Sequence, residues 1–280
     1  MCPTKNYVNS YLKMDSLWNQ ELIENNLRVI NRRMNKIILK LGILLLMTSC
    51  QTINKSYNPQ VVTLVNSGVG GHTTKNLLDR IDSDVINYHP DLTIVMVGTN
   101  DMLNSRKMIS YEEYKQNLEQ IIIKLKAEGS QVLLMSPPPA DSAYLFERHD
   151  KTLYKDAPNV IMDSLSHIVE QTALDNKVLF FNINAMFQKM DLPKHNQDLY
   201  FRNVKNCGKG DGVHPTQLGY KLIADRVFEF LSENNLLKKF KTIVCFGDSI
   251  TSGAGSVGGG TVTGKNYPSF LLQRIREIAD

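Results

Sequence analysis

Apolar runs of strand length alternate with segments of helical periodicity from residue 61 to residue 278. The runs predict five strands, at 61–65, 92–97, 132–135, 178–183 and 240–246. Apolar residues at helical spacing predict helices over 74–88, 110–128, 160–174, 217–231 and 268–278. The run 92–97 is apolar at almost every position, which is typical of a strand buried on both faces of a parallel sheet. The pattern predicts a three-layer α/β/α sandwich with a five-stranded parallel sheet.

The first fifty residues follow a different pattern. Residues 1–33 mix polar residues with a loosely helical apolar pattern, and we interpret them as an extension outside the native protein. Residues 34–50 combine a basic start, an apolar run too short for a comfortable membrane span, and small closing residues. This is the anatomy of an export signal, with translation starting at Met34; a buried apolar helix of the fold is the alternative. The predicted organisation is therefore an extension (1–33), a signal segment (34–50) and one domain (57–280).

Charge is concentrated in the same N-terminal part. The chain carries a formal charge of +4, and residues 1–50 hold seven basic and three acidic side chains. The other 230 residues carry 25 basic and 25 acidic side chains and are neutral as a whole. This balance argues against a nucleic-acid partner.

The cysteines and most histidines do not indicate a metal. Cys2, Cys50, Cys207 and Cys245 lack paired metal-ligand spacing, and Cys245 within a predicted strand is expected to be a buried, inert thiol. Five histidines lack partners at ligand spacing (His72, His89, His149, His167 and His195), so we expect neither a metal nor a cofactor. His72, next to Gly71, is either a residue of the substrate pocket or a solvated loop histidine.

Four polar blocks follow predicted strands, where open α/β sheets place their chemistry. Gly247-Asp248-Ser249 ends the last strand, and the Gly-rich segment 66–74 follows the first. Gly98-Thr99-Asn100-Asp101 follows the second strand, and the segment 211–216, Asp-Gly-Val-His-Pro-Thr, lies between the fourth strand and the next helix. A serine at such a place acts as a nucleophile only where a base and an oxyanion site converge on it.

With these four blocks together, the chain resembles the SGNH hydrolases, also called the GDSL esterase/lipase family. The resemblance implies a flavodoxin-like fold, Ser249 as nucleophile, and Asp211 and His214 as the other triad members. It also implies an oxyanion hole formed by Ser249, Gly71 and Asn100. His214 would accept the Ser249 proton and return it to the leaving alcohol, while Asp211 would hold the imidazole in the required tautomer.

The order of the blocks departs from the family. There the serine block opens the domain, whereas here it closes it, and moving residues 240–280 ahead of Tyr57 restores the usual order. We interpret this as a circular permutation, which neighbouring termini make tolerable. A rotated reading frame from a circular or misassembled contig would give the same sequence.

Each site residue also has a structural interpretation. Ser249 alone reads better as a turn or cap serine, the glycines of 66–74 as loop residues, and Asp211 with Pro215 as a turn before a helix. Asp248 is expected to bond backbone groups in its turn. The segment 259–266 is one residue from a phosphate-binding P-loop, but it lies far beyond its strand, and we interpret it as a mobile lid beside Ser249.

The resemblance implies ester hydrolysis but leaves the substrate open among deacetylases, short-chain esterases, lysophospholipases and thioesterases. The predicted loops 140–156 and 189–209 are polar and carry aromatic residues that we expect to be available for stacking on sugars: Tyr144, Phe146, Tyr154, Tyr200 and Phe201. They favour an acetylated glycan or a similar small acyl ester. The alternative to an enzyme is a surface glycan-binding module without catalytic activity.

The end of the signal segment resembles the lipobox of bacterial lipoproteins. Cys50 would be the lipidated residue, although Met47 stands where that pattern usually has Leu. The resemblance implies an exported protein held at a membrane through a lipid anchor.

Overall fold

The structure is a computed structural model, and it describes residues 62–278. The predicted extension 1–33 and signal segment 34–50, with Cys2 and Cys50, lie outside the described residues. Five parallel strands form one sheet in the order β1-β5-β2-β3-β4. They are β1 (Thr63–Gly68), β2 (Leu92–Met96), β3 (Gln131–Met135), β4 (Leu179–Phe181) and β5 (Thr242–Gly247).

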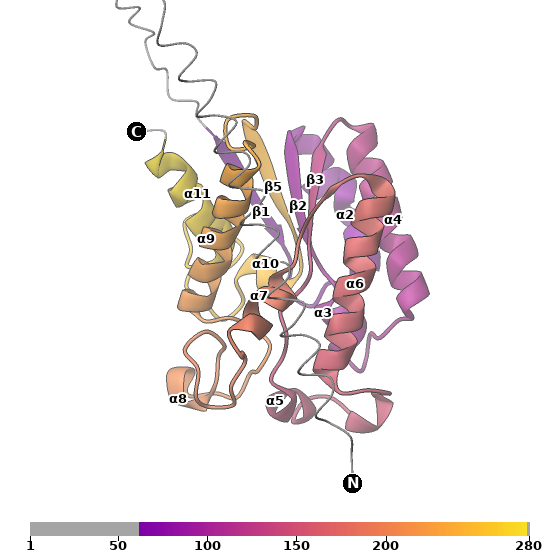
Figure 1. Cartoon of the computed structure of the whole chain (residues 1–280), viewed down its shortest axis with the longest axis vertical. Helices are drawn as coiled ribbons and strands as arrows, with labels where there is room; N and C mark the ends of the chain where they lie inside the picture. Colours follow the sequence, from indigo (N-terminus) through magenta and orange to yellow (C-terminus); the bar gives the residue numbers. More distant parts are fainter. Residues whose placement is uncertain (1–61, 279–280) are drawn as a thin grey trace, which may run out of the picture. The chain divides into compact units, whose positions relative to one another are not determined.

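Long helices cover both faces of the sheet (Figure 1). One layer holds α2 (Thr74–Asp84), α4 (Tyr111–Ala127) and α6 (Pro158–Asn176), and the other holds α9 (Gln217–Glu233) and α11 (Tyr267–Glu277). Strand β2 is buried along its whole length, as its apolar sequence requires. The predicted three-layer α/β/α sandwich with a five-stranded parallel sheet is confirmed.

Side-chain caps explain where several helices begin. Ser110 accepts a hydrogen bond from the Glu113 backbone N–H at the start of α4, and Thr216 and Asn266 cap α9 and α11 in the same way. Pro158 opens α6, where a missing backbone N–H costs nothing. These residues fix the helix starts close to the predicted positions.

The sequence pattern missed the short elements. The helix predicted over 74–88 ends at Asp84 and is followed by the 3₁₀ turn η1 (Ile86–Tyr88). The strand predicted over 178–183 is shorter, because Asn182 caps α7 (Ile183–Lys189) through the Ala185 N–H. The loops also contain α3 (Thr99–Leu103), α5 (Ser142–Phe146), η2 (Lys151–Leu153), α8 (Val204–Cys207) and α10 (Ser249–Ser252). Such one-turn helices are too short to show helical periodicity.

The last strand in the chain lies inside the sheet. β5 pairs with β1 from Thr242 to Gly247 and with β2 from Ile243 to Gly247. Counted from β5 as the first strand, the sheet order becomes 2-1-3-4-5, the order of flavodoxin-like doubly wound folds. The sheet therefore has the arrangement that residues 240–280 would give at the head of the domain, and the origin of the permuted order stays a prediction.

Asp91 holds the entry of β5. Its Oδ2 atom accepts hydrogen bonds from the backbone N–H groups of Lys241 and Thr242, at 2.7 and 2.8 Å. Leu236 is buried in the link that precedes the strand. The short connection from α9 thus delivers β5 to the amino edge of the sheet.

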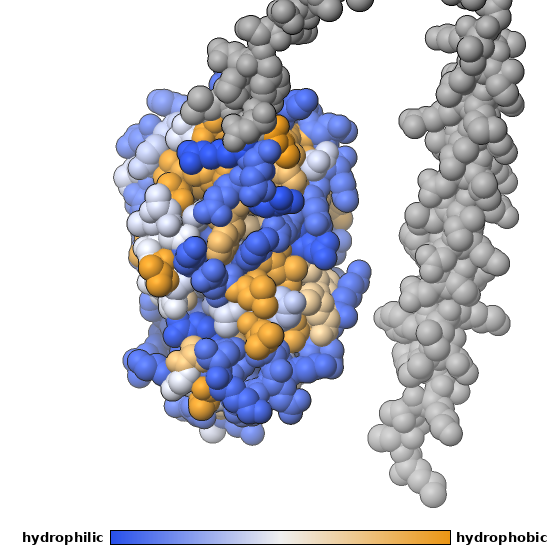
Figure 2. All heavy atoms as spheres, turned by 90° about the vertical axis from the view of Figure 1, so that its left-hand side faces the viewer, coloured by the Kyte–Doolittle hydropathy of each residue, from blue (hydrophilic) through white to orange (hydrophobic). Residues whose placement is uncertain are grey.

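The side of the domain that carries α9 and α11 is largely hydrophilic, with hydrophobic residues in small separate groups (Figure 2). None of the helices formed by residues 62–278 is long and apolar enough to cross a membrane.

Candidate active site

Ser249 is the first residue of α10, directly beyond the carboxyl end of β5. Asp248 caps this helix, because its Oδ1 atom accepts a hydrogen bond from the Ile250 N–H at 2.8 Å. A Cβ atom on Gly247 would lie 2.2 Å from the Met96 carbonyl oxygen, so the turn requires glycine there. The expectation that Asp248 bonds backbone groups in the turn is confirmed.

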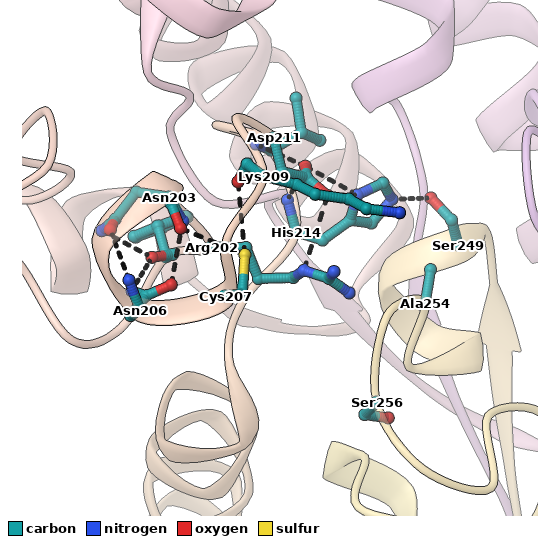
Figure 3. A network of polar contacts seen from close by, with 12 residues as sticks. Arg202, Asn203, Asn206, Cys207, Lys209, Asp211, His214, Ser249, Ala254 and Ser256 are labelled. Atoms are coloured by element: carbon teal, nitrogen blue, oxygen red, sulfur yellow. Dashed lines mark hydrogen bonds and ion pairs between the residues drawn. The ribbon is translucent and has the colours of Figure 1, made fainter.

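His214 and Asp211 lie on one loop that faces Ser249 (Figure 3). The His214 Nε2 and Ser249 Oγ atoms are 2.9 Å apart. On the other side of the ring, Nδ1 lies 2.9 and 3.0 Å from the two Asp211 carboxylate oxygens. The fold therefore joins three predicted site residues in one hydrogen-bonded row, although Ser249 follows His214 by 35 positions.

The Asp211 carboxylate is held in its charged form. Burial alone would raise the pKa of Asp211, but hydrogen bonds and charge from His214 and the backbone N–H groups of Val213 and His214 lower it to about 2. Because the carboxylate can only accept, Nδ1 of His214 carries a proton and donates it toward Asp211. In the neutral ring Nε2 is then the acceptor of the Ser249 hydroxyl, as general-base work requires.

A neighbouring strand-like segment supports this loop. The Arg202 N–H donates to the His214 carbonyl at 3.0 Å, the Gly212 N–H donates to the Arg202 carbonyl, and Phe201 pairs antiparallel with Pro215. The Arg202 Nε atom lies 3.7 Å from the Asp211 carboxylate. The backbone of the loop is thus fixed on both sides of His214.

Gly71 and Asn100 line the same cavity as Ser249 and His214, with a volume of about 540 Å³. Gly71 has a φ of +75°, which favours glycine. One Asn100 amide hydrogen is donated to the His72 carbonyl at 3.0 Å, which leaves the second hydrogen of that group for a ligand. All five predicted site residues in the described part of the chain are therefore brought together.

Two residues whose role the sequence pattern did not reveal, the buried Asp101 and the partly buried Arg80, position these blocks. Asp101 accepts hydrogen bonds from the backbone N–H and hydroxyl of Thr74, at 2.9 and 2.6 Å, and so ties the Asn100 turn to the start of α2. The Arg80 guanidinium donates to the carbonyls of Gly247 and Ser67 and to Asp84. It therefore joins the carboxyl ends of β5 and β1.

None of the five aromatic residues expected to be available for sugar stacking lines this cavity, and the prediction is wrong for Tyr144 and Phe201. Tyr144 and Phe201 are buried; the Tyr144 hydroxyl donates to Asn196, and the Phe201 ring packs on Phe187. Phe146, Tyr154 and Tyr200 are partly buried and pack against the main hydrophobic core. In their place the cavity is lined by residues of other loops, including Arg106, Lys107, Arg148 and His149.

His72 does not line this cavity. Its Nδ1 atom accepts a hydrogen bond from Arg80 Nε at 3.0 Å, and the ring is partly buried. His72 is therefore a bonded loop residue, neither a residue of this cavity nor a freely solvated one.

The segment after α10 is bonded to its surroundings. The Gly260 N–H donates to the Ser252 carbonyl at 2.6 Å, and the Tyr220 hydroxyl donates to the Ala254 carbonyl at 3.1 Å. Of residues 253–266, Ala254 alone lines the cavity. The segment thus flanks the site, and its proposed role as a mobile lid stays a prediction.

Neither described cysteine is paired. Cys245 is buried in β5, and burial raises the pKa of its thiol to about 12, which confirms the expected inert thiol. Cys207 is partly buried in α8, where its Sγ–H donates to the Asn203 carbonyl. Residues 62–278 contain no group of three or more His, Cys, Asp or Glu side chains that could hold a metal ion.

Asp248 should make the stability of the domain depend on pH. Burial raises the pKa of Asp248 to about 7, so the folded state retains a proton that the unfolded chain releases near pH 4. This contribution to the free energy of unfolding is complete below pH 4 and is lost as the pH rises through 7. In Asp248→Asn, which keeps the Oδ1 cap, denaturant unfolding should show a gain relative to wild type of about 4 kcal/mol on going from pH 4 to pH 8, because a shift of about three pKa units is involved.

Any cost of the new amide group is independent of pH and cancels in that comparison. A stability difference between Asp248→Asn and wild type that stays constant from pH 4 to pH 8 would show that the carboxyl is ionised throughout.

Comparison with known proteins gives the family. The family model described as GDSL-like Lipase/Acylhydrolase matches residues 19–227, which is more than half of the chain. The chain belongs to this family. The match contains Gly71, Asn100, Asp211 and His214 and ends before Ser249, so the serine block of this GDSL-like acylhydrolase lies outside the matched range.

Similar proteins include two curated relatives and one solved structure. An acetylxylan esterase of Geobacillus stearothermophilus is 25% identical over 170 residues, 58% of this chain and 69% of the relative. An uncharacterized lipoprotein, YqeF, of Bacillus subtilis is 29% identical over 79 residues, 27% of this chain and 32% of the relative. The crystal structure of a putative acylhydrolase from Bacteroides fragilis is 25% identical, with a TM-score of 0.47, covering 60% of this chain and 73% of that one.

The family and the esterase relative together show what class of enzyme this acylhydrolase is. It is a carboxylic ester hydrolase of the SGNH type.

Proposed function

We propose that this hydrolase cleaves acyl esters by a Ser-His-Asp mechanism in which Ser249 is the nucleophile. The observation that carries the proposal is the row from Ser249 Oγ through the His214 ring to Asp211, with each step at 2.9–3.0 Å. His214 takes the hydroxyl proton as Ser249 attacks the acyl carbon, and then delivers it to the leaving alcohol. Water repeats the sequence on the acyl-enzyme.

The developing oxyanion is stabilised by the backbone N–H groups of Ser249 and Gly71 and by the Asn100 amide. Neither backbone N–H donates to any group in residues 62–278, and both residues line the cavity. Donors aimed at a developing charge stabilise the transition state more than the ground state.

Replacement of Asn100 tests this role. In Asn100→Ala, kcat should fall by about 10²- to 10³-fold while KM changes little, because the contact with the oxyanion is made in the transition state. Steady-state kinetics with p-nitrophenyl acetate would measure both constants. A variant that melts at the wild-type temperature and retains full kcat would exclude Asn100 from the oxyanion hole.

The substrate we propose is a small acyl ester, most simply an acetyl ester on a carbohydrate. The support is the similarity to an acetylxylan esterase, together with a cavity lined mainly by polar and charged residues. A screen over acetylated xylan, acetylated sialic acid, a lysophospholipid and an acyl thioester would test it. Preferred hydrolysis of the lysophospholipid or the thioester would replace the carbohydrate ester with the alternative activities of the family.

A non-catalytic glycan-binding module is the competing function. It predicts binding of glycans without hydrolysis of any acyl ester, whereas the 2.9 Å contact between Ser249 Oγ and His214 Nε2 supports a nucleophile with its base. Turnover of p-nitrophenyl acetate by the wild-type protein decides between them.

The export proposal concerns a part of the chain outside the described residues. We propose that the protein is an exported lipoprotein anchored through Cys50. The support is the lipobox-like sequence and the similarity to a protein named as a lipoprotein. Incorporation of labelled palmitate into wild-type protein in bacterial cells, and its loss in Cys50→Ser, is the expected result. Equal labelling of both would place the lipid elsewhere, and no labelling would remove the anchor.

A further inference from the structure

Basic side chains surround the candidate active site. Of the fourteen residues that line its cavity, three are lysine or arginine, two are histidines (His149 and His214), and none is acidic. The cations are Arg106 and Lys107, which follow α3, and Arg148, which follows α5. A volume of about 540 Å³ lies within the range of roughly 300–1,000 Å³ typical of small-molecule sites. The cavity therefore combines Ser249 with a positively charged wall formed by Arg106, Lys107 and Arg148, called the positive wall below.

Two of these three charges have no carboxylate partner among the described residues. Within residues 62–278, Arg106 and Lys107 form no ion pair. Arg148 forms an ion pair with Asp211 at 3.8 Å, and it shares that carboxylate with His214. The positive wall thus keeps its charge available for a ligand.

Two of the three cations are held at the cavity. Lys107 Nζ donates to the Gly71 carbonyl at 2.5 Å, and Arg148 Nη2 donates to the Asp211 carbonyl at 2.5 Å. Each contact uses one donor of a group that has three or five, so both cations retain donors for a ligand. Arg106 makes no side-chain contact of this kind, and its guanidinium remains wholly available.

Two histidines near the cavity have lowered pKa values, with burial as the first cause and neighbouring positive charges as the second. Burial, followed by the charges of Arg148 and Arg106, lowers the pKa of His149. Burial, followed by Arg80 and Lys107, lowers the pKa of His72. The local field is therefore positive, although the 230 residues after residue 50 are neutral as a whole. The positive wall does not follow from overall composition.

We propose that the carrier of the acyl ester bears an anionic group, a sugar carboxylate or a sugar phosphate, which binds to Arg106, Lys107 and Arg148 while the ester lies at Ser249. This inference rests on the proposed esterase function and narrows its substrate class. Lys and Arg head groups are the donors that proteins use for carboxylate and phosphate.

A matched pair of substrates tests the charge alone. An O-acetylated methyl glucuronoside is compared as the free acid and as its neutral methyl ester, with the acetylated glucose 6-phosphate analogue as a third substrate. The free acid or the phosphate should have a kcat/KM about tenfold above that of the methyl ester at low ionic strength. The preference should shrink at high salt, because screening weakens the attraction of partly exposed charges. The anionic substrate with the higher kcat/KM shows whether the carrier bears a carboxylate or a phosphate.

Arg106→Gln is the cleanest variant, because Arg106 does not contact the catalytic groups. It should lower kcat/KM for the anionic substrate about threefold and leave that for the methyl ester unchanged. The matched control is Arg276→Gln, which removes the same charge from an exposed position on α11 and should change neither value.

Equal kcat/KM for acid, phosphate and methyl ester, without dependence on salt, would overturn the inference. Hydrolysis of p-nitrophenyl acetate in the same preparations reports the esterase function separately, so the two proposals fail independently. Calorimetry on Ser249→Ala gives a second measurement without turnover: glucuronate should bind more tightly than its methyl ester, and equal affinity would count against the anionic group.

Discussion

Ser249→Ala is expected to lower kcat for p-nitrophenyl acetate by roughly 10⁵- to 10⁶-fold, the loss typical when a serine nucleophile is removed from a triad. The Ser249 Oγ atom is the group that bonds His214 Nε2 at 2.9 Å, and alanine leaves the imidazole with no hydroxyl to activate. Residual activity should come from the oxyanion donors and the cavity. Single-turnover and steady-state assays of the purified variant would measure the loss.

Ser252→Ala provides the matched control. Ser252 lies in the same short helix, α10, and does not line the cavity. It should retain near wild-type kcat, and both variants should melt near the wild-type temperature. Comparable activity of Ser249→Ala and Ser252→Ala would assign the hydrolysis to another residue.

The fold was predictable because its strands and long helices are strongly patterned. The apolar runs at 92–97 and 240–246 predicted two strands, and the structure shows that these strands, β2 and β5, lie side by side. Parallel strands end at one edge of the sheet, so residues that follow them had to meet. This is why Ser249, His214 and Asn100 could be proposed as one site from distant positions.

The lining of the cavity was not predictable in the same way. Arg106, Lys107 and Arg148 lie in loops whose path depends on one-turn helices without periodicity. Tyr144 shows the converse error, because a polar loop was expected to leave its ring exposed, whereas the loop folds over it. Arg80 resembles any surface arginine of an amphipathic helix, and the structure alone shows that it bonds two strand ends.

Asp211→Asn should lower kcat by about 10⁴-fold with little change in KM. The two Asp211 carboxylate oxygens lie 2.9 and 3.0 Å from Nδ1 of His214. They orient the ring so that Nδ1 carries the proton and Nε2 accepts a hydrogen bond from Ser249. An asparagine amide placed against Nδ1 stabilises the opposite tautomer, in which Nε2 holds the proton and cannot accept another. Asp82→Asn, on the exposed face of α2, is the matched control and should retain activity.

Asp211→Asn should also change how the free energy of unfolding depends on pH. Since the pKa of Asp211 is lowered to about 2 and an unfolded aspartate titrates near 4, its carboxylate contributes about 2 kcal/mol above pH 4. This contribution is lost as the pH falls from about 4 to 2, because the folded state then takes up a proton that the unfolded state already holds. Urea unfolding from pH 7 to pH 2 should therefore show a steeper loss of stability for wild type than for Asp211→Asn. Parallel curves would mean that His214 and the backbone N–H groups do not hold Asp211 as its ion, and the basis for the His214 tautomer would be lost with it.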